Sequence, residues 1–126
     1  MILLRNGVDI LEIERLEQAI QRHGDRFLGR VFTQREIEET DRNPESLAAR
    51  FAAKEAVSKA LGTGIGEVGW QEIEILRGPA RQPVLNLKGF ALKLAEEQGL
   101  ESWAISLSHT RNLAIAFVTA VGLRIS

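Results

Sequence analysis

Cysteine is absent from this sequence of 126 residues, and histidine occurs only twice, as His23 and His109. The lack of cysteine excludes a disulfide framework, thiolate zinc sites, iron–sulfur clusters and a thiol nucleophile. Two histidines are too few for a multi-histidine metal site. The fold must therefore be held by packing, and the length is enough to close one hydrophobic core. We expect a single domain over residues 1–126.

An excess of charge of either sign is also lacking, because 16 Lys and Arg residues stand against 17 Asp and Glu residues. Proteins that bind nucleic acid through its phosphates usually have a clear basic excess, so we expect no nucleic-acid partner. No window reaches the roughly 20 apolar residues of a membrane span. The first residues also lack the basic and apolar regions of a secretory signal. We therefore expect no membrane association and a cytoplasmic location.

Only three prolines interrupt the chain, and the remaining organisation is predicted from periodicity. Helices are expected at 11–22, from Thr33 to about residue 39, at 45–61 and at 90–98. Thr33 and Glu36 have the spacing of a capping box. The segment 45–61 is rich in strong helix formers and has no internal glycine or proline. Gly24 and Gly99 are the expected stops of the first and last of these helices.

Alternating or continuous apolar patterns predict strands at 2–10, 70–76, 84–87, 103–109 and 113–121. The second and third strands are expected to form a hairpin, and the all-apolar last strand is expected to be buried. This mixture predicts an α+β domain in which helices pack on one side of a mainly antiparallel sheet.

Three charged residues of the helix at 45–61 are candidates for chemistry. Lys54 falls inside the apolar arc that Leu47, Phe51 and others form, while Glu55 and Lys59 lie one turn apart beside it. In the simplest interpretation Lys54 extends its stem along the core to reach water, and Glu55 with Lys59 is a surface ion pair. The alternative interpretation is that Lys59 contributes to a site that binds an anion.

The glycine-rich turn Gly62-Thr63-Gly64-Ile65-Gly66 follows this helix and has neither a Walker nor a dinucleotide pattern. Its backbone amides can turn toward an anion near Lys59, or it can simply cap the helix. Asp9 is a carboxylate within an apolar strand, which is costly unless it is paired or bound to a cation. Oxygen ligands such as Asp9 and Glu55 suit Mg²⁺, and His109 ends a strand on an apolar face.

These residues belong to segments that closely resemble the holo-[acyl-carrier-protein] synthase family of the 4′-phosphopantetheinyl transferase superfamily. The resemblance runs in order and at the right spacing from Asp9 to His109, and its helix motif is highly specific. The matching segments are Gly7 to Ile10 with Glu14-Arg15, Phe32-Thr33-x-x-Glu36, Arg50 to Ala56 with Lys59 to Gly64, and Ser106 to His109.

The resemblance implies an enzyme that moves the 4′-phosphopantetheine arm of coenzyme A onto a serine of apo acyl carrier protein and releases adenosine 3′,5′-bisphosphate. It implies service to fatty acid biosynthesis and a homotrimer with active sites between neighbouring subunits. It also assigns Asp9 and Glu55 as Mg²⁺ ligands and Lys59 to the pyrophosphate. Further coenzyme A contacts are implied at Arg50, Gly62, Thr63, Gly64, His109 and Thr110.

The carrier protein is expected at Arg15, as the resemblance implies, and at Arg22. Arg15, Arg22, Arg26 and Arg30 follow one another at spacings of seven, four and four residues, which form a basic stripe if the segment is helical. Such a stripe suits an acidic partner, although solvated arginines are the simpler interpretation.

Two questions stay open at this point. The serine proton can pass to Glu55 or to a metal-bound water held by Asp9. The same residues also suit a Mg²⁺-dependent hydrolase of a nucleotide diphosphate, or an interaction module without catalysis.

Overall fold

The computed structural model describes residues 1–123, and the end of the expected domain, residues 124–126, lies outside the described part. The elements within it follow one another in this order: β1 (Ile2–Glu12), α1 (Ile13–His23), α2 (Asp25–Val31), α3 (Gln34–Thr40), α4 (Pro44–Leu61), the 3₁₀ turn η1 (Trp70–Glu72), β2 (Ile73–Arg77), β3 (Pro83–Leu87), α5 (Gly89–Gln98), β4 (Leu100–His109) and β5 (Leu113–Leu123).

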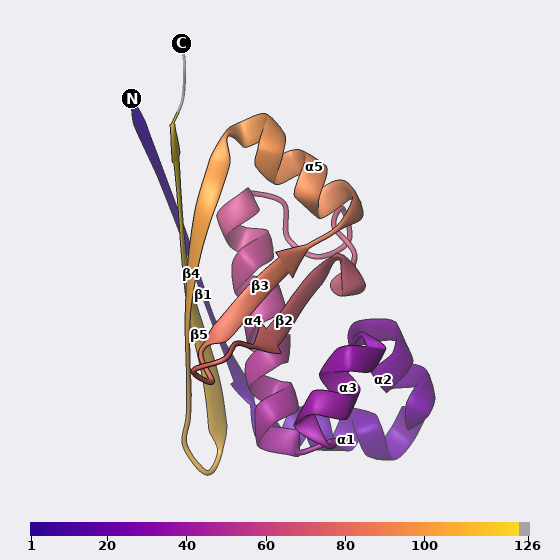
Figure 1. The fold of residues 1–126 in the computed structure, drawn as a ribbon. Coiled ribbons are helices and arrows are strands. Elements are labelled where there is room, and N and C mark those ends of the chain that lie inside the picture. Colours follow the sequence, from indigo (N-terminus) through magenta and orange to yellow (C-terminus); the bar gives the residue numbers. More distant parts are fainter. Residues whose placement is uncertain (124–126) are drawn as a thin grey trace.

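A long three-stranded antiparallel sheet, with strand order β1-β5-β4, forms one side of the molecule (Figure 1). The helices lie on a single side of this sheet, which confirms the predicted α+β architecture. The hairpin of β2 and β3 also forms as predicted, but it is a separate two-stranded sheet. No helix of residues 1–123 has the length and apolar character needed to cross a membrane.

Helix α4 packs closely on the sheet because the contact is built from small side chains. Its buried face carries Ala52, Ala53, Ala56 and Ala60, and the buried positions of β5 are mostly alanine. Gly7 of β1 belongs to the same contact, since a Cβ at that position would overlap the Ala56 carbonyl oxygen. This close approach brings the later turns of α4 beside the middle of β1.

The prediction that the last strand is buried is wrong for half of its residues. Strand β5 alternates between buried small side chains, which face α4, and exposed large ones. The outer face of the sheet is therefore apolar and uncovered in the single chain. Its exposed apolar side chains are Ile2, Leu4, Val8, Ile10, Leu113, Ile115, Phe117, Val121 and Leu123.

The helical segment that precedes α3 differs from prediction in two places. Leu11 continues β1 by pairing with Ala114, so α1 begins at Ile13. Helix α2 was not expected, because seven residues are too few to show a clear period. Its formation depends on tertiary packing, in which Leu28 and Val31 bury their side chains in a second apolar cluster with α1 and α4.

Candidate active site

Asp9 lies on the inner face of β1 and reaches the end of α4. Lys59 Nζ donates to Asp9 Oδ1 and to the Val8 carbonyl oxygen, each at 3.0 Å. The Asp9 carboxylate is one-fifth exposed and the Lys59 side chain is half exposed. The predicted cost of a carboxylate in this strand is thus offset by a lysine from a helix some fifty residues later.

Glu55 lies one turn before Lys59 on α4 and belongs to the same group. Burial raises the pKa of the Glu55 carboxyl, and the negative charge of Asp9 raises it further, while Lys59 opposes the shift. The two carboxylates are therefore close enough to repel one another, which is the arrangement that a divalent cation relieves. Among residues 1–123 no cluster of three or more His, Cys, Asp or Glu side chains forms that could hold a metal ion, and Mg²⁺ binding by this pair stays a prediction.

Lys54 does not extend to water, and that interpretation of the sequence is wrong. Its side chain is fully buried, and its Nζ lies 2.8 Å from Glu36 Oε1 and 2.6 Å from the Ile73 carbonyl oxygen. Burial lowers the pKa of the Lys54 ammonium, and Glu36 opposes the shift. Glu36 also completes the predicted capping box with Thr33. Lys54 is therefore a structural cation inside the fold.

The glycine-rich turn after α4 caps the helix. Gly62 and Gly64 adopt positive φ values of 86° and 77°, and the amides of Gly62, Thr63 and Gly64 all donate to the last carbonyls of α4. The interpretation of these three amides as an anion cradle is therefore wrong, because they are already bonded within the helix terminus. Contact between this turn and coenzyme A stays a prediction.

Arg50 is buried on the face of α4 opposite to Lys59, where it lines a cavity of about 360 Å³. Its Nε donates to the Ile75 carbonyl oxygen at 3.1 Å, and its guanidinium pairs with Glu39 at 2.8 Å. The cavity also contains Arg77 and Arg81, which the sequence analysis did not single out. No local pattern marks these two residues, because the β2–β3 hairpin brings them to α4 only in the folded chain.

His109 is the last residue of β4 and lines the same cavity as Arg50. Its ring is about half exposed and lies 3.5 Å from Glu45 at the start of α4. Thr110 begins the following turn, where its side chain accepts hydrogen bonds from the Asn112 and Leu113 amides. The structure thus joins Arg50 and His109, which are far apart in the sequence.

The predicted site residues fall into two groups on opposite sides of α4. Arg50 and Lys59 are nine residues apart, which places them half a helical revolution apart around the axis and about 14 Å apart along it. Lys59 faces β1 with Asp9, whereas Arg50 faces β2. A single chain therefore does not bring the carboxylates and the Arg50 cavity into one site.

Arg15 and Arg22 are exposed on α1, and Gly24, the expected stop of that helix, separates α1 from α2, so the four arginines do not form a stripe on one continuous helix. Arg15 borders an apolar groove that includes Leu16, Phe27 and Phe51. A neighbouring groove is lined by His23, Arg26, Phe27 and Arg30. Phe27 is common to both grooves, so Arg15, Arg26 and Arg30 line adjoining grooves.

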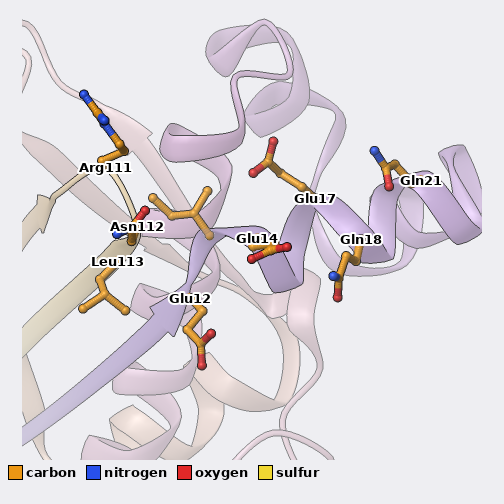
Figure 2. A pocket seen from close by; sticks show the side chains of 9 residues that line it. Glu12, Glu14, Glu17, Gln18, Gln21, Arg111, Asn112 and Leu113 are labelled. Atoms are coloured by element: carbon orange, nitrogen blue, oxygen red, sulfur yellow. The ribbon is translucent and has the colours of Figure 1, made fainter.

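A further cavity, of about 840 Å³, lies between the start of α1 and the β4–β5 turn. Figure 2 shows Glu12, Glu14 and Glu17 on one side of it, with Arg111 and Asn112 on the other. None of the residues predicted for the active site lines this cavity.

Comparison with known proteins decides the family. The family model of the 4′-phosphopantetheinyl transferase superfamily matches residues 5–118. The chain is also 44% identical to the holo-[acyl-carrier-protein] synthase of Herpetosiphon aurantiacus, over 95% of this chain and all of the relative. The chain belongs to the holo-[acyl-carrier-protein] synthase family. It is therefore a phosphopantetheinyl transferase, as the resemblance implied.

Solved structures of this family have the same fold. The Helicobacter pylori holo-[acyl-carrier-protein] synthase, in complex with coenzyme A, matches with a TM-score of 0.84 and 34% identity, covering 91% of this chain and 98% of that one. The Bacillus anthracis synthase, in complex with CoA (3′,5′-ADP), matches with a TM-score of 0.79 and 31% identity, covering 98% of this chain and all of the other.

Proposed function

We propose that this phosphopantetheinyl transferase transfers the 4′-phosphopantetheine group of coenzyme A to a serine of apo acyl carrier protein. The serine oxygen forms a bond to the phosphorus that carries the pantetheine arm, the pyrophosphate bond breaks, and adenosine 3′,5′-bisphosphate leaves. Family membership supports the reaction type, and the coenzyme A complex of the Helicobacter pylori relative supports the donor. The holo carrier protein would serve fatty acid biosynthesis in the cytoplasm.

Asp9 and Glu55 are the proposed ligands of Mg²⁺. Their donor chemistry fits this ion, because Mg²⁺ commonly takes one or two protein carboxylates and completes its shell with waters and substrate phosphates. Burial is the main cause that raises the pKa of Glu55, and the charge of Asp9 is the second; this second cause supports the assignment, because it requires the two carboxylates to be near one another. Mg²⁺ bound here would neutralise charge on the pyrophosphate.

Lys59 is the proposed partner of the leaving phosphate. Its side chain is half exposed and its ammonium lies beside Asp9, so it can approach an anion bound next to the two. Two groups can accept the serine proton: the Glu55 carboxylate, whose pKa is raised, or a water beside Asp9. The other contributions of the chain are positioning and electrostatic.

The cavity lined by Arg50 and His109 is the proposed site of the adenosine bisphosphate portion of coenzyme A. Arg77 and Arg81 add two further cations to its wall, which suits a ligand with several phosphates. Because Glu39 already pairs with Arg50, we expect Arg77 and Arg81 to contribute most of the positive charge that attracts the phosphates.

A homotrimer in which the active site is shared between subunits is the proposed assembly. The carboxylates and the Arg50 cavity lie on opposite sides of α4, so one coenzyme A molecule reaches both only if they come from different subunits. The exposed apolar face of the β1-β5-β4 sheet supplies the surface for the contact. Burial of such a large apolar patch favours association.

Acyl carrier protein is proposed to dock on the surface of α1 that carries Arg15 and Arg22. The apolar groove beside Arg15 would take apolar side chains of the carrier, and the arginines would pair with its acidic groups.

One experiment tests the reaction. The protein is incubated with Mg²⁺, coenzyme A and apo acyl carrier protein, and the carrier is weighed by mass spectrometry. We expect its mass to increase by one phosphopantetheine group. Cleavage of coenzyme A without the carrier would indicate a nucleotide hydrolase instead. Unchanged coenzyme A and unchanged carrier, with the protein folded, would contradict both enzyme assignments.

A further inference from the structure

Strand β2 has one edge paired with β3, and within residues 1–123 its other edge is bonded by side chains rather than by a strand. Lys54 Nζ donates to the Ile73 carbonyl oxygen and Arg50 Nε donates to the Ile75 carbonyl oxygen. Two carbonyl oxygens of this edge therefore accept hydrogen bonds from two cations of α4. The spacing of four residues between Arg50 and Lys54 matches two successive acceptors of the strand.

The amides of the same edge are satisfied by two acids of α3. The Ile75 amide donates to Glu36 at 2.9 Å, and the Arg77 amide donates to both oxygens of Glu39, at 2.9 and 3.0 Å. The three-residue spacing of Glu36 and Glu39 places them on one face of α3. Backbone groups that would otherwise be unpaired are thus held by charged groups that are themselves paired.

Each acid of this edge is also bound to one of the cations. Glu36 pairs with Lys54 at 2.8 Å, and Glu39 pairs with Arg50 at 2.8 Å. The Lys54 pair is completely buried, whereas Glu39 is about one-quarter exposed. The pair of Lys54 and Glu36 therefore lies in the protein interior, and the pair of Arg50 and Glu39 lies beside the cavity.

Glu39 has a position that the other acid lacks. It does not line the Arg50 cavity, yet it contacts two residues that do. It holds Arg50 through the guanidinium and Arg77 through the backbone amide. Arg77 is the last residue of β2, and the turn that follows carries Arg81. Through Glu39, α3 therefore holds both Arg50 of α4 and Arg77 of the β2–β3 hairpin, which line the cavity.

We propose that Glu39 is a positioning residue for coenzyme A binding, which it serves by fixing the separation of Arg50 and the β2–β3 hairpin without contacting the ligand. This inference rests on the proposed function, because the cavity matters for the reaction only if coenzyme A binds there. Positioning of this kind changes the affinity for coenzyme A and leaves the chemistry at Asp9 and Glu55 unchanged.

The variant Glu39→Gln tests the proposal with little change of shape. The new amide oxygen can still accept from the Arg77 backbone, but its NH₂ group opposes the donors of Arg50. Glu38→Gln is the matched control, because Glu38 is the preceding residue of α3 and is exposed. Both variants and the unmodified protein are titrated with coenzyme A by calorimetry. They are then assayed with apo acyl carrier protein while each substrate is varied separately.

For Glu39→Gln we expect the Kd and the KM for coenzyme A to rise about tenfold, which is the effect of one lost charge-assisted contact. The kcat and the KM for the carrier should stay within about twofold of the unmodified values. Glu38→Gln should leave all four constants unchanged.

Three results would overturn the proposal. Unchanged coenzyme A constants in Glu39→Gln, with an active unmodified protein, would reject the positioning role and leave the proposed function standing. A fall in kcat alone, in proportion to a loss of folded protein, would show that Glu39 acts only on stability. Failure of the unmodified protein to bind coenzyme A would reject the proposed function first and this inference with it.

Discussion

Lys59 Nζ lies 3.0 Å from Asp9 Oδ1, although 50 positions separate the two residues in the chain. The contact exists because Gly7 and the alanines of α4 let the helix approach β1 closely. Asp9 and Lys59 are thus coupled through backbone packing, and the geometry of the candidate active site depends on small residues that take no part in its chemistry.

Replacement of either carboxylate should abolish metal-dependent turnover. Asp9→Ala and Glu55→Ala each remove one of two proposed Mg²⁺ ligands, so we expect kcat to fall roughly a thousandfold while the fold is kept. Glu101→Ala, at an exposed position of β4, is the control and should be fully active. Normal turnover of folded Glu55→Ala would reject the metal assignment.

Substitution of Arg15 should affect only the protein substrate. If Arg15 pairs with a carboxylate of the carrier, Arg15→Ala raises the KM for apo carrier protein and weakens its salt dependence, while the KM for coenzyme A is unchanged. Arg15→Glu should be worse, since attraction becomes repulsion. Lys93→Ala, an exposed cation of α5, is the control. A change confined to the KM for coenzyme A would place Arg15 in the nucleotide site instead.

A charge on the outer sheet face should dissociate the proposed trimer. Val8 and Phe117 are paired neighbours on β1 and β5, and both side chains are about half exposed in the single chain. Phe117→Glu would bury a carboxylate in the subunit contact, so we expect a folded, inactive monomer in sedimentation experiments. An active monomer, whether of this variant or of the unmodified protein at low concentration, would contradict the shared active site.

Removing only one charge of the buried pair of Lys54 and Glu36 should destabilise the fold more than removing both charges. Lys54→Met leaves the Glu36 charge buried without its cation, so we expect the free energy of unfolding to fall by about 3–5 kcal/mol. Adding Glu36→Gln removes that charge and should recover part of the loss. Denaturant titrations of the two variants measure the difference. Additive losses in the double variant would show that the pair is not coupled.

Acid should destabilise the protein partly through Glu74. Burial raises the pKa of this carboxyl, but hydrogen bonds from Thr33, Asn86 and Lys88 outweigh burial and hold the pKa below its ordinary value. A folded-state pKa below that of the unfolded chain contributes stability that is present above the unfolded pKa and is lost as the pH falls through the folded one.

The free energy of unfolding should therefore fall as the pH decreases from about 5 toward 3. In Glu74→Gln this decrease should be shallower, because the titrating group is gone. Glu101→Gln should follow the unmodified protein. Equal slopes for Glu74→Gln and the unmodified protein would show that Glu74 does not contribute to the acid sensitivity.

The sequence by itself determined the elements whose bonds are local. The helix at 44–61 was predicted to within one residue, because its hydrogen bonds and its side-chain propensities act within a few turns. The capping box of Thr33 and Glu36 was also predicted, since both partners lie in one turn. The residue pattern singled out Asp9, Glu55 and Lys59, and the family motifs then identified the enzyme and implied a role for each of them.

Tertiary structure decided which of these residues meet. Whether Lys54 reaches water or is buried depends on α3 and β2, which no spacing within α4 reveals. The division of the site between two sides of α4 has the same origin, as does the exposure of one face of β5. Periodicity reports that a residue is apolar or out of pattern, but burial is a property of what packs against it, and that contact forms only when distant segments of the chain are brought together.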